Sequence, residues 1–201
     1  MRYSTPTILI KYLYYYWVAA NSKGHGIHSP FVYQFIRDTL NAKNALEQVE
    51  NSAPVVKKIL QEIEVVSSNS LKPKIKLLIA RMLHSLNPLT YFVSGNKKQF
   101  EIDSAFNNHN FIESVESIDF AWIGEGHNLA TILLDANKVI DKMHSNSCII
   151  LNGIHTDSNM EAAWNQLKQH TQIRLTIDLF SIGMLFCRKE QKEKEHFIIR
   201  Y

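Results

Sequence analysis

The sequence predicts an α/β protein built on a mixed β-sheet, with helices before the sheet and an antiparallel β-hairpin at its C-terminal end. Two observations predict this fold. Between Pro73 and Leu167, apolar strand segments alternate with amphipathic helices, which is typical of parallel strands joined by helical crossovers. After Ile173 only strand-like segments follow, and short turns join antiparallel strands. The 201 residues, of which 45% are hydrophobic, suffice for one domain with a proper core.

The first third of the chain is expected to be helical. Its three predicted helices are Thr7–Ala20, Phe31–Leu40 and Pro54–Val66. Ser29 and Pro30 occupy the N-cap and first helical positions that these residue types prefer. A polar run over residues 67–70 marks a boundary. We therefore expect an N-terminal helical cap over residues 1–70 and the main α/β domain over residues 71–201.

The second region carries the remaining elements. Helices are expected over Pro73–Leu86, over Leu129–Met143 and from a capping residue at Thr156 or Asp157 onward. Strands are expected over Thr90–Ser94, Phe120–Ile123, Ser147–Leu151, Ile173–Phe180, Met184–Arg188 and His196–Tyr201, with weaker patterns at Ile102 and Phe111–Val115. The turn Ser181-Ile182-Gly183 closes the C-terminal hairpin.

Composition narrows the classes of function. The net charge is +3 and the basic residues are scattered, which favours solvated faces over a nucleic-acid-binding surface. Cys148 and Cys187 lie in apolar strand patterns, which predicts reduced core residues of a cytoplasmic protein. The apolar run Thr7–Ala20 is interrupted by Lys11 and is too short to span a bilayer. We expect a docking helix there, in preference to an exported or membrane-surface segment.

Three segments carry a resemblance to a known family. HGIHSPF begins at His25, DFAWIGEGH begins at Asp119 and CIILNGIH begins at Cys148. With the order of strands and helices, they resemble the class I SAM-dependent methyltransferases, and more narrowly a bacterial O-methyltransferase-like branch. The resemblance is weak or absent over Lys97–Ser117. It implies a reduced Rossmann-like methyltransferase fold.

The resemblance also implies where a cofactor would bind. Such enzymes have a glycine-rich turn after the first strand, where SAM approaches the backbone, and an acid after the second strand, which holds the ribose. Gly95 and Asp103 are the positions that match. Metal-dependent members carry acidic residues after two later strands, where this chain has Gly124 and Asn152-Gly153. Those strand ends keep the position of a site without its charged groups, and no metal site is expected.

The spacing of the two cofactor positions is short. Gly95 and Asp103 are eight positions apart, whereas a dinucleotide fingerprint places its acid about twenty positions after its glycines. A crossover between parallel strands needs at least about ten residues. We therefore expect at least one crossover helix on the cofactor side to be missing. The favoured hypothesis is a catalytically degenerate protein that binds no cofactor and acts as a binding or assembly module, with an unknown protein partner or as a homodimer.

The alternative is an active O- or N-methyltransferase with a remodelled SAM site. In it Glu125 would replace the missing acid, and His127 and His155 would share a metal ion or act as a base, because they follow neighbouring strands. Two histidines without a carboxylate make a poor metal site, so capping roles are favoured for them. Surface positions are likewise favoured for Asp103 and Glu125. A nucleic-acid-binding remnant is the least favoured class, because the cations are dispersed.

Overall fold

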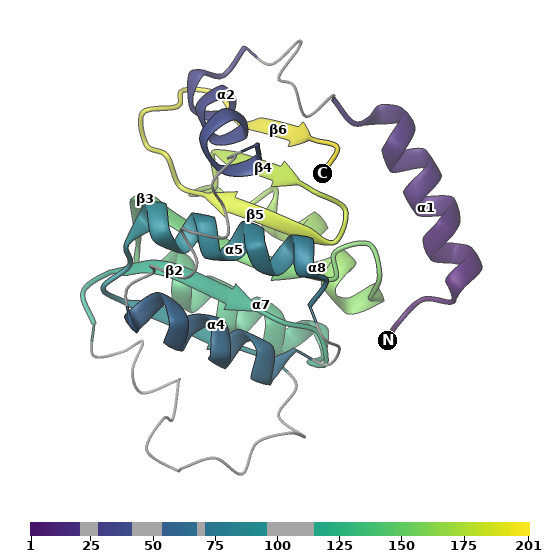
Figure 1. Ribbon diagram of the computed structural model, residues 1–201, viewed down its shortest axis with the longest axis horizontal. Helices are drawn as coiled ribbons and strands as arrows, with labels where there is room; N and C mark the ends of the chain where they lie inside the picture. Colours follow the sequence, from purple (N-terminus) through teal and green to yellow (C-terminus); the bar gives the residue numbers. More distant parts are fainter. Residues whose placement is uncertain (21–27, 42–53, 68–70, 96–114) are drawn as a thin grey trace.

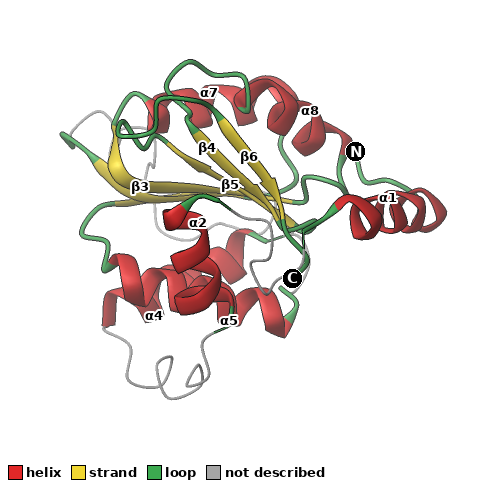
Figure 2. Ribbon diagram, turned by 90° about the horizontal axis from the view of Figure 1, so that it is seen from above, coloured by secondary structure: helices red, strands yellow, loops and turns green. Residues whose placement is uncertain are grey.

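A central β-sheet lies between two layers of helices (Figure 1, Figure 2). The structure is a computed structural model that describes residues 1–20, 28–41, 54–67, 71–95 and 115–201. The sheet contains both parallel and antiparallel pairs. The predicted α/β class with a mixed sheet is therefore confirmed.

All the described helices except α1 lie on one or the other face of the sheet. They are α1 (Thr5–Val18), α2 (Pro30–Phe35), α4 (Pro54–Val66), α5 (Pro73–Leu86), α7 (Leu129–Ile140) and α8 (Ser158–Leu167), with a π-helical turn, η1 (Ile36–Leu40), directly after α2. Helices α2, α4 and α5 cover one face, and α7 and α8 cover the other (Figure 2). Helix α1 covers neither face and lies beside the sheet.

The six strands of the described sheet run in the order β1-β2-β3-β5-β4-β6. They are β1 (Tyr91–Ser94), β2 (Ile118–Ile123), β3 (Met143–Asn152), β4 (Leu175–Asp178), β5 (Ile182–Phe186) and β6 (Glu195–Ile198). Strands β1, β2 and β3 are parallel, whereas β5 is antiparallel to both β3 and β4. The expected C-terminal hairpin is thus β4–β5, but Ile182 and Gly183, which were predicted in its turn, belong to β5. The weaker strand patterns at Ile102 and over residues 111–114 lie outside the described residues.

Successive side chains of a strand point to opposite faces of the sheet, so each face carries its own hydrophobic cluster. On β2, Phe120 and Trp122 face α4 and α5, whereas Ala121 and Ile123 face α7 and α8. This alternation is the period of two expected of a strand that is buried on both faces. Because both faces are covered, the carboxyl ends of the parallel strands are the edge of the sheet at which a ligand would be expected.

Several helix boundaries differ from the prediction, and α1 covers Thr5–Val18 where Thr7–Ala20 was predicted. Helix α7 ends at Ile140, because Met143 already pairs with Ile118 as the first residue of β3. The helix predicted over Phe31–Leu40 changes to a π-helical turn after Phe35. The Nη1 atom of Arg81 donates to the carbonyl oxygens of Thr39 and Leu40 and so holds the end of that turn.

Of the predictions for Ser29 and Pro30, the helix start is confirmed and the side-chain cap is not. Pro30 does begin α2, but the hydroxyl of Ser29 is buried and makes no capping hydrogen bond. Helix α1 docks through Tyr15 and Ala19, which form a small cluster with Phe180. Within the described ranges, no helix combines the length and the apolar character needed to cross a bilayer. The division at residue 70 stays a prediction.

Candidate functional site

The carboxyl ends of β1, β2 and β3 meet at one edge of the sheet. Ser94 pairs with Ile123, and Ile123 pairs with Leu151, so the residues that follow these strands are neighbours. Gly95, Gly124 and Gly153 therefore lie side by side at this edge. The expectation that His127 and His155 follow neighbouring strands is also confirmed.

Gly95, the position matched to a cofactor turn, is packed against the end of α4. A Cβ added at Gly95 would lie 2.4 Å from the carbonyl oxygen of Val66 and 2.8 Å from its Cβ. Gly124 is close to β1 in turn, since its N–H donates to the carbonyl of Ser94 at 2.7 Å. Helix packing and strand contact thus account for both glycines without a ligand.

A buried polar pair lies just before Gly95. The hydroxyl of Ser94 donates to Oδ2 of Asp135 at 2.8 Å, and both residues are buried. Asp135 comes from α7, so this hydrogen bond joins the last residue of β1 to the helix that covers it. The carboxylate faces the sheet and stabilises the contact between α7 and β1.

Glu125 lies over the turn that follows β3. A Cβ at Gly153 would be 2.5 Å from Oε1 of Glu125, and Gly153 has φ +85°. The hydroxyl of Thr156 donates to the same oxygen at 3.3 Å. Burial raises the pKa of the Glu125 carboxyl, while Arg2 and the hydrogen bond from Thr156 oppose that rise. This carboxylate therefore fills the space beside Gly153.

The structure pairs His155 with Asp178, the last residue of β4. Their Nε2 and Oδ2 atoms are 2.7 Å apart, and Asp178 is buried. The other carboxylate oxygen accepts from the backbone N–H of Phe180 at 2.8 Å. The Phe180 ring stacks on His155, with centroids 5.2 Å apart, and Tyr15 of α1 packs against it. A carboxylate that orients a histidine in this way is the arrangement of a general base.

His127, the other histidine candidate, lies near the start of α8. The carbonyl of His127 accepts from the side chain of Asn159, which places its backbone beside the start of α8. Asp103 lies outside the described residues. In the part of the chain that the structure describes, no three His, Cys, Asp or Glu side chains gather closely enough to hold a metal ion.

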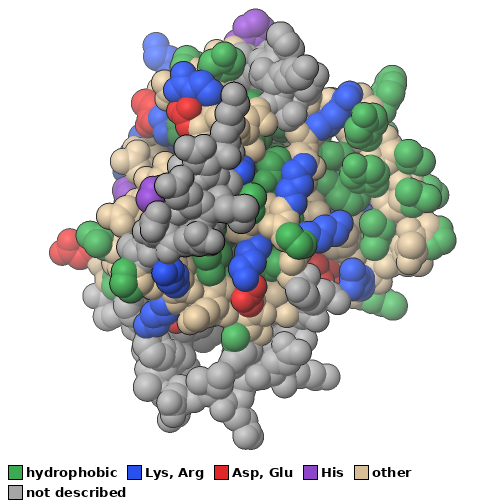
Figure 3. Space-filling view, viewed as in Figure 1, with side chains coloured by type: hydrophobic (Ala, Val, Ile, Leu, Met, Phe, Trp, Pro, Cys, Tyr) green, Lys and Arg blue, Asp and Glu red, His purple; other side chains and the backbone are tan. Residues whose placement is uncertain are grey.

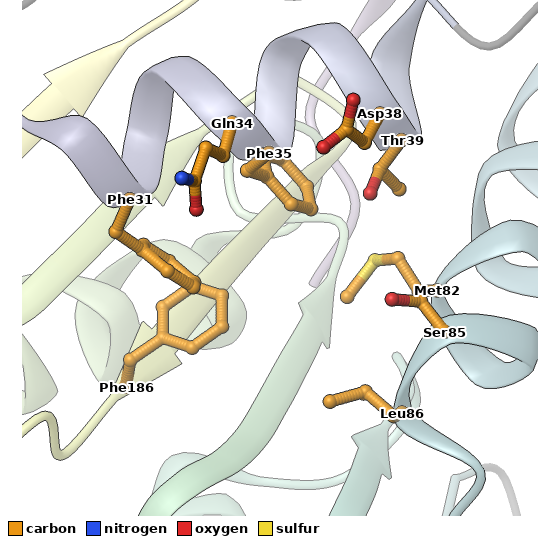
Figure 4. A pocket seen from close by; sticks show the side chains of 9 residues that line it. All are labelled: Phe31, Gln34, Phe35, Asp38, Thr39, Met82, Ser85, Leu86 and Phe186. Carbon is orange, nitrogen blue, oxygen red and sulfur yellow. The ribbon is translucent and has the colours of Figure 1, made fainter.

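A hollow of about 200 Å³ lies on the face of the sheet that α2 and α5 cover, between α2, η1 and α5 (Figure 4). Phe31 and Phe186 form one wall in an edge-to-face contact, with ring centroids 5.4 Å apart. Met82 and Leu86 of α5 form another, and Asp38 lies at its rim. This volume is below the ~300–1,000 Å³ of pockets that enclose drug-sized ligands.

A second hollow, of about 470 Å³, lies between α1 and the C-terminal residues. The lysine and arginine side chains that line this hollow lie over aromatic rings of the same lining. The Nζ atom of Lys74 is 4.2 Å from the ring centroid of Tyr201, and the guanidinium of Arg200 is 4.3 Å from that of Tyr16. This hollow marks the part of α1 that is not packed closely on the body of the protein.

Sequence reasoning missed Asp135 and Asp178, although a pattern was present for each. Asp135 comes three positions after Ile132 and four before Val139, so it shares their buried stripe. Asp178 alternates with Ile177 in a strand that is buried on both faces. An acid at such a position has a specific partner, because an unpaired buried carboxylate is costly.

No model of a known protein family matches this chain, and no curated protein is significantly similar to it. The fold and the site define its class, an α/β protein whose six-stranded mixed sheet is covered on both faces. The suggestion of a family comes from the sequence segments around His25, Asp119 and Cys148.

Proposed function

We propose that this chain is a reduced relative of the class I SAM-dependent methyltransferases that has lost the cofactor site and acts as a binding or assembly module. The resembling segments at Asp119–His127 and Cys148–His155 support the family, because they form the ends of two adjacent parallel strands. The β4–β5 hairpin agrees with the antiparallel end that the resemblance implies.

One observation carries the loss of the cofactor site. The space beside Gly95, at which SAM would have to approach, is occupied by the end of α4, since a Cβ added there would lie 2.4 Å from the carbonyl oxygen of Val66. A cofactor turn needs open space over its glycine, since the absence of a side chain serves to admit the ligand. Here the space that Gly95 leaves is taken by the protein itself.

The described residues do not fit SAM at the neighbouring strand ends either. Ser94 is hydrogen-bonded to Asp135, and Glu125 covers Gly153. Binding a nucleoside there would require these contacts to break. The position matched to the ribose acid, Asp103, lies outside the described residues, so the proposal rests on Gly95, Glu125 and their neighbours.

Isothermal titration of the full chain with SAM and with S-adenosylhomocysteine tests this proposal. We expect no saturable heat for either compound when the protein is at roughly 100 µM, which would place any affinity weaker than that concentration. Micromolar binding of either compound would overturn it. The Asp103→Ala variant identifies the cause in that case, since binding that the variant loses would belong to a remodelled nucleoside site.

The His155–Asp178 pair supports one other candidate, an active methyltransferase in which His155 removes a proton from the acceptor. Its contacts argue against that use, because Phe180 stacks on the imidazole ring and α1 covers Phe180. The two candidates differ in a variant. If the chain is an enzyme, His155→Ala keeps S-adenosylhomocysteine binding and loses methyl transfer, whereas our proposal expects neither activity in the wild type.

A further inference from the structure

Helix α1 has two apolar faces, and among the described residues only one of them has a partner. Ile8, Tyr15 and Ala19 face the body of the protein and pack with Phe180. Tyr15 also donates its hydroxyl hydrogen to the carbonyl oxygen of Ile199. This docked face fixes the orientation of the helix beside the sheet (Figure 1).

The opposite face consists of Leu9, Ile10, Leu13, Tyr14 and Trp17, which we call the outer stripe. Ile10, Leu13, Tyr14 and Trp17 follow the i, i+3, i+4, i+7 spacing of one helix face. Their exposed fractions are 68%, 61%, 67% and 81%. Side chains of this kind gather over α1 in the space-filling view (Figure 3). Contiguous exposed apolar surface of this size marks an interaction site.

The outer stripe carries no charge. The one charged residue of α1 is Lys11, and its Nζ is 2.6 Å from Oε1 of Glu161 on the docked side. A helix that is apolar all round is normally buried all round. The composition of α1 therefore requires a second partner that is itself apolar and uncharged where it meets the stripe.

The area of the outer stripe matches that of a dimer interface. From their exposed fractions, its side chains and the adjoining Tyr16 offer roughly 700 Å² of surface, close to the ~800 Å² that each partner contributes to a stable complex. Aromatic residues are also enriched at such interfaces and supply most of the binding energy. Trp17 and Tyr14 are the residues of the stripe that fit that role.

We propose that the outer stripe is the interface of a homodimer, in which α1 packs against α1 of a second copy. A neutral apolar stripe is complementary to itself, so a two-fold axis brings no like charges together. Leu13 is the central residue of the segment Leu9–Trp17, so the axis places Leu13 of one copy against Leu13 of the other. A lipid surface fits less well, because membrane-surface helices carry Lys and Arg on the face beside the stripe.

This inference names a second copy of the chain as the partner for the assembly role proposed above, and it rests on that role. The two fail separately, because titration with SAM tests the strand ends and sedimentation tests α1. Loss of the dimer would leave the cofactor result unchanged, and detection of SAM binding would leave the oligomeric state unchanged.

Sedimentation velocity of the full chain, with Leu13→Lys and Leu13→Glu variants, is the test. We expect the wild type to be a dimer at roughly micromolar concentrations. Either variant raises the dimer dissociation constant by about 100-fold or more, because two like charges would be buried face to face. An equimolar mixture of the two variants regains the dimer, since the axis then pairs a lysine with a glutamate.

Leu89 supplies the matched control, because it is a leucine that is 87% exposed at a site remote from α1 in the sequence. Leu89→Lys and Leu89→Glu are expected to sediment as the wild type does. Because Leu13 is exposed in the protomer, its variants keep the far-UV circular dichroism of the wild type. A second variant, Trp17→Lys, guards against misfolding of the first.

Four results would contradict the inference. A monomeric wild type would do so, as would Leu13 variants that remain dimeric. The third is flotation of a monomeric wild type with phosphatidylglycerol–phosphatidylcholine vesicles, abolished by Leu13→Lys, because the stripe would then bind lipid. Failure of the mixed variants to form a dimer would exclude the two-fold contact at Leu13.

Discussion

The Nε2 atom of His155 lies 2.7 Å from Oδ2 of Asp178, and this contact joins the turn after β3 to the last residue of β4. Asp178 also accepts the backbone N–H of Phe180, whose ring stacks on the same imidazole. Tyr12 and Tyr15 of α1 then pack on Phe180. The His155–Asp178 hydrogen bond and the docking of α1 are thus parts of one arrangement.

Asp178→Asn is expected to destabilise the protein. The substitution replaces a buried carboxylate that accepts hydrogen bonds from two directions, so the unfolding free energy should fall by about 1–3 kcal/mol. Urea unfolding followed by tryptophan fluorescence measures the change. Asp141→Asn, at an exposed position after α7, is the control and should match the wild type. An unaltered midpoint for Asp178→Asn would show that the pair contributes nothing.

Gly153→Ala should destabilise for two separable reasons. Gly153 has φ +85°, which strains any residue with a side chain, and its new methyl group would meet Glu125. We expect a loss of about 1–3 kcal/mol. Adding Glu125→Ala removes the steric part and leaves the backbone strain, so the double variant should be more stable than the sum of the single effects predicts. Strict additivity in urea unfolding would contradict the contact.

Glu125 should make the stability depend on pH. Its pKa is raised by burial, so between the unfolded value of about 4.3 and the raised folded value the folded state binds more protons than the unfolded state. Stability therefore falls as pH rises through this window. Glu125→Gln removes the effect. The unfolding free energy of the variant relative to that of the wild type should therefore increase from about pH 4 to pH 7.

Equilibrium urea unfolding at several pH values measures this difference. Glu116→Gln, at an exposed position before β2, is the control and should follow the wild-type curve. A Glu125→Gln curve parallel to that of the wild type over the whole range would mean that burial does not affect this carboxyl.

Tyr15→Phe should loosen α1 from the body of the protein. The substitution leaves the buried carbonyl of Ile199 without the hydroxyl that donates to it, at a cost of about 1–2 kcal/mol. Tyr33→Phe removes a hydroxyl from a side chain that is 48% exposed and should have no such effect. Thermal unfolding and limited proteolysis after residues of α1 report the change. Equal protection of both variants would contradict a role for this hydrogen bond.

Neither cysteine should react in the native protein. Cys148 and Cys187 are buried and free, and burial raises the pKa of both thiols. The thiolate is the reactive form, so Ellman's reagent should detect no thiol in the folded chain and two in denaturant. Rapid release of thionitrobenzoate without denaturant would show that a cysteine is accessible.

Local patterns predicted the elements well where the pattern was complete. The helices expected over Pro54–Val66 and Pro73–Leu86 agree with α4 and α5, because each begins at a proline and has one apolar stripe. The helix expected over Leu129–Met143 was too long. Its last apolar residue, Met143, fits the helical period equally well, and only pairing with Ile118 assigns it to β3.

The candidate site was less predictable, because its contacts join distant parts of the chain. Gly95 follows β1 at the position matched to a cofactor turn, yet its nearest neighbour is Val66 at the end of α4. In the enzyme alternative His155 would act with His127, but its partner is Asp178, 23 residues further on. No spacing rule in the sequence states which loops will meet.

The sequence by itself determined the kinds of element and their order, since helical and strand periodicities are properties of neighbouring residues. Tertiary structure decided which ends meet. Gly183 of β5 pairs with Leu151 on one side and with Asp178 on the other. A Cβ there would lie 2.7 Å from the ring of Trp164. Close packing of a helix on that glycine therefore holds β5 between β3 and β4, and this placement brings Asp178 to His155.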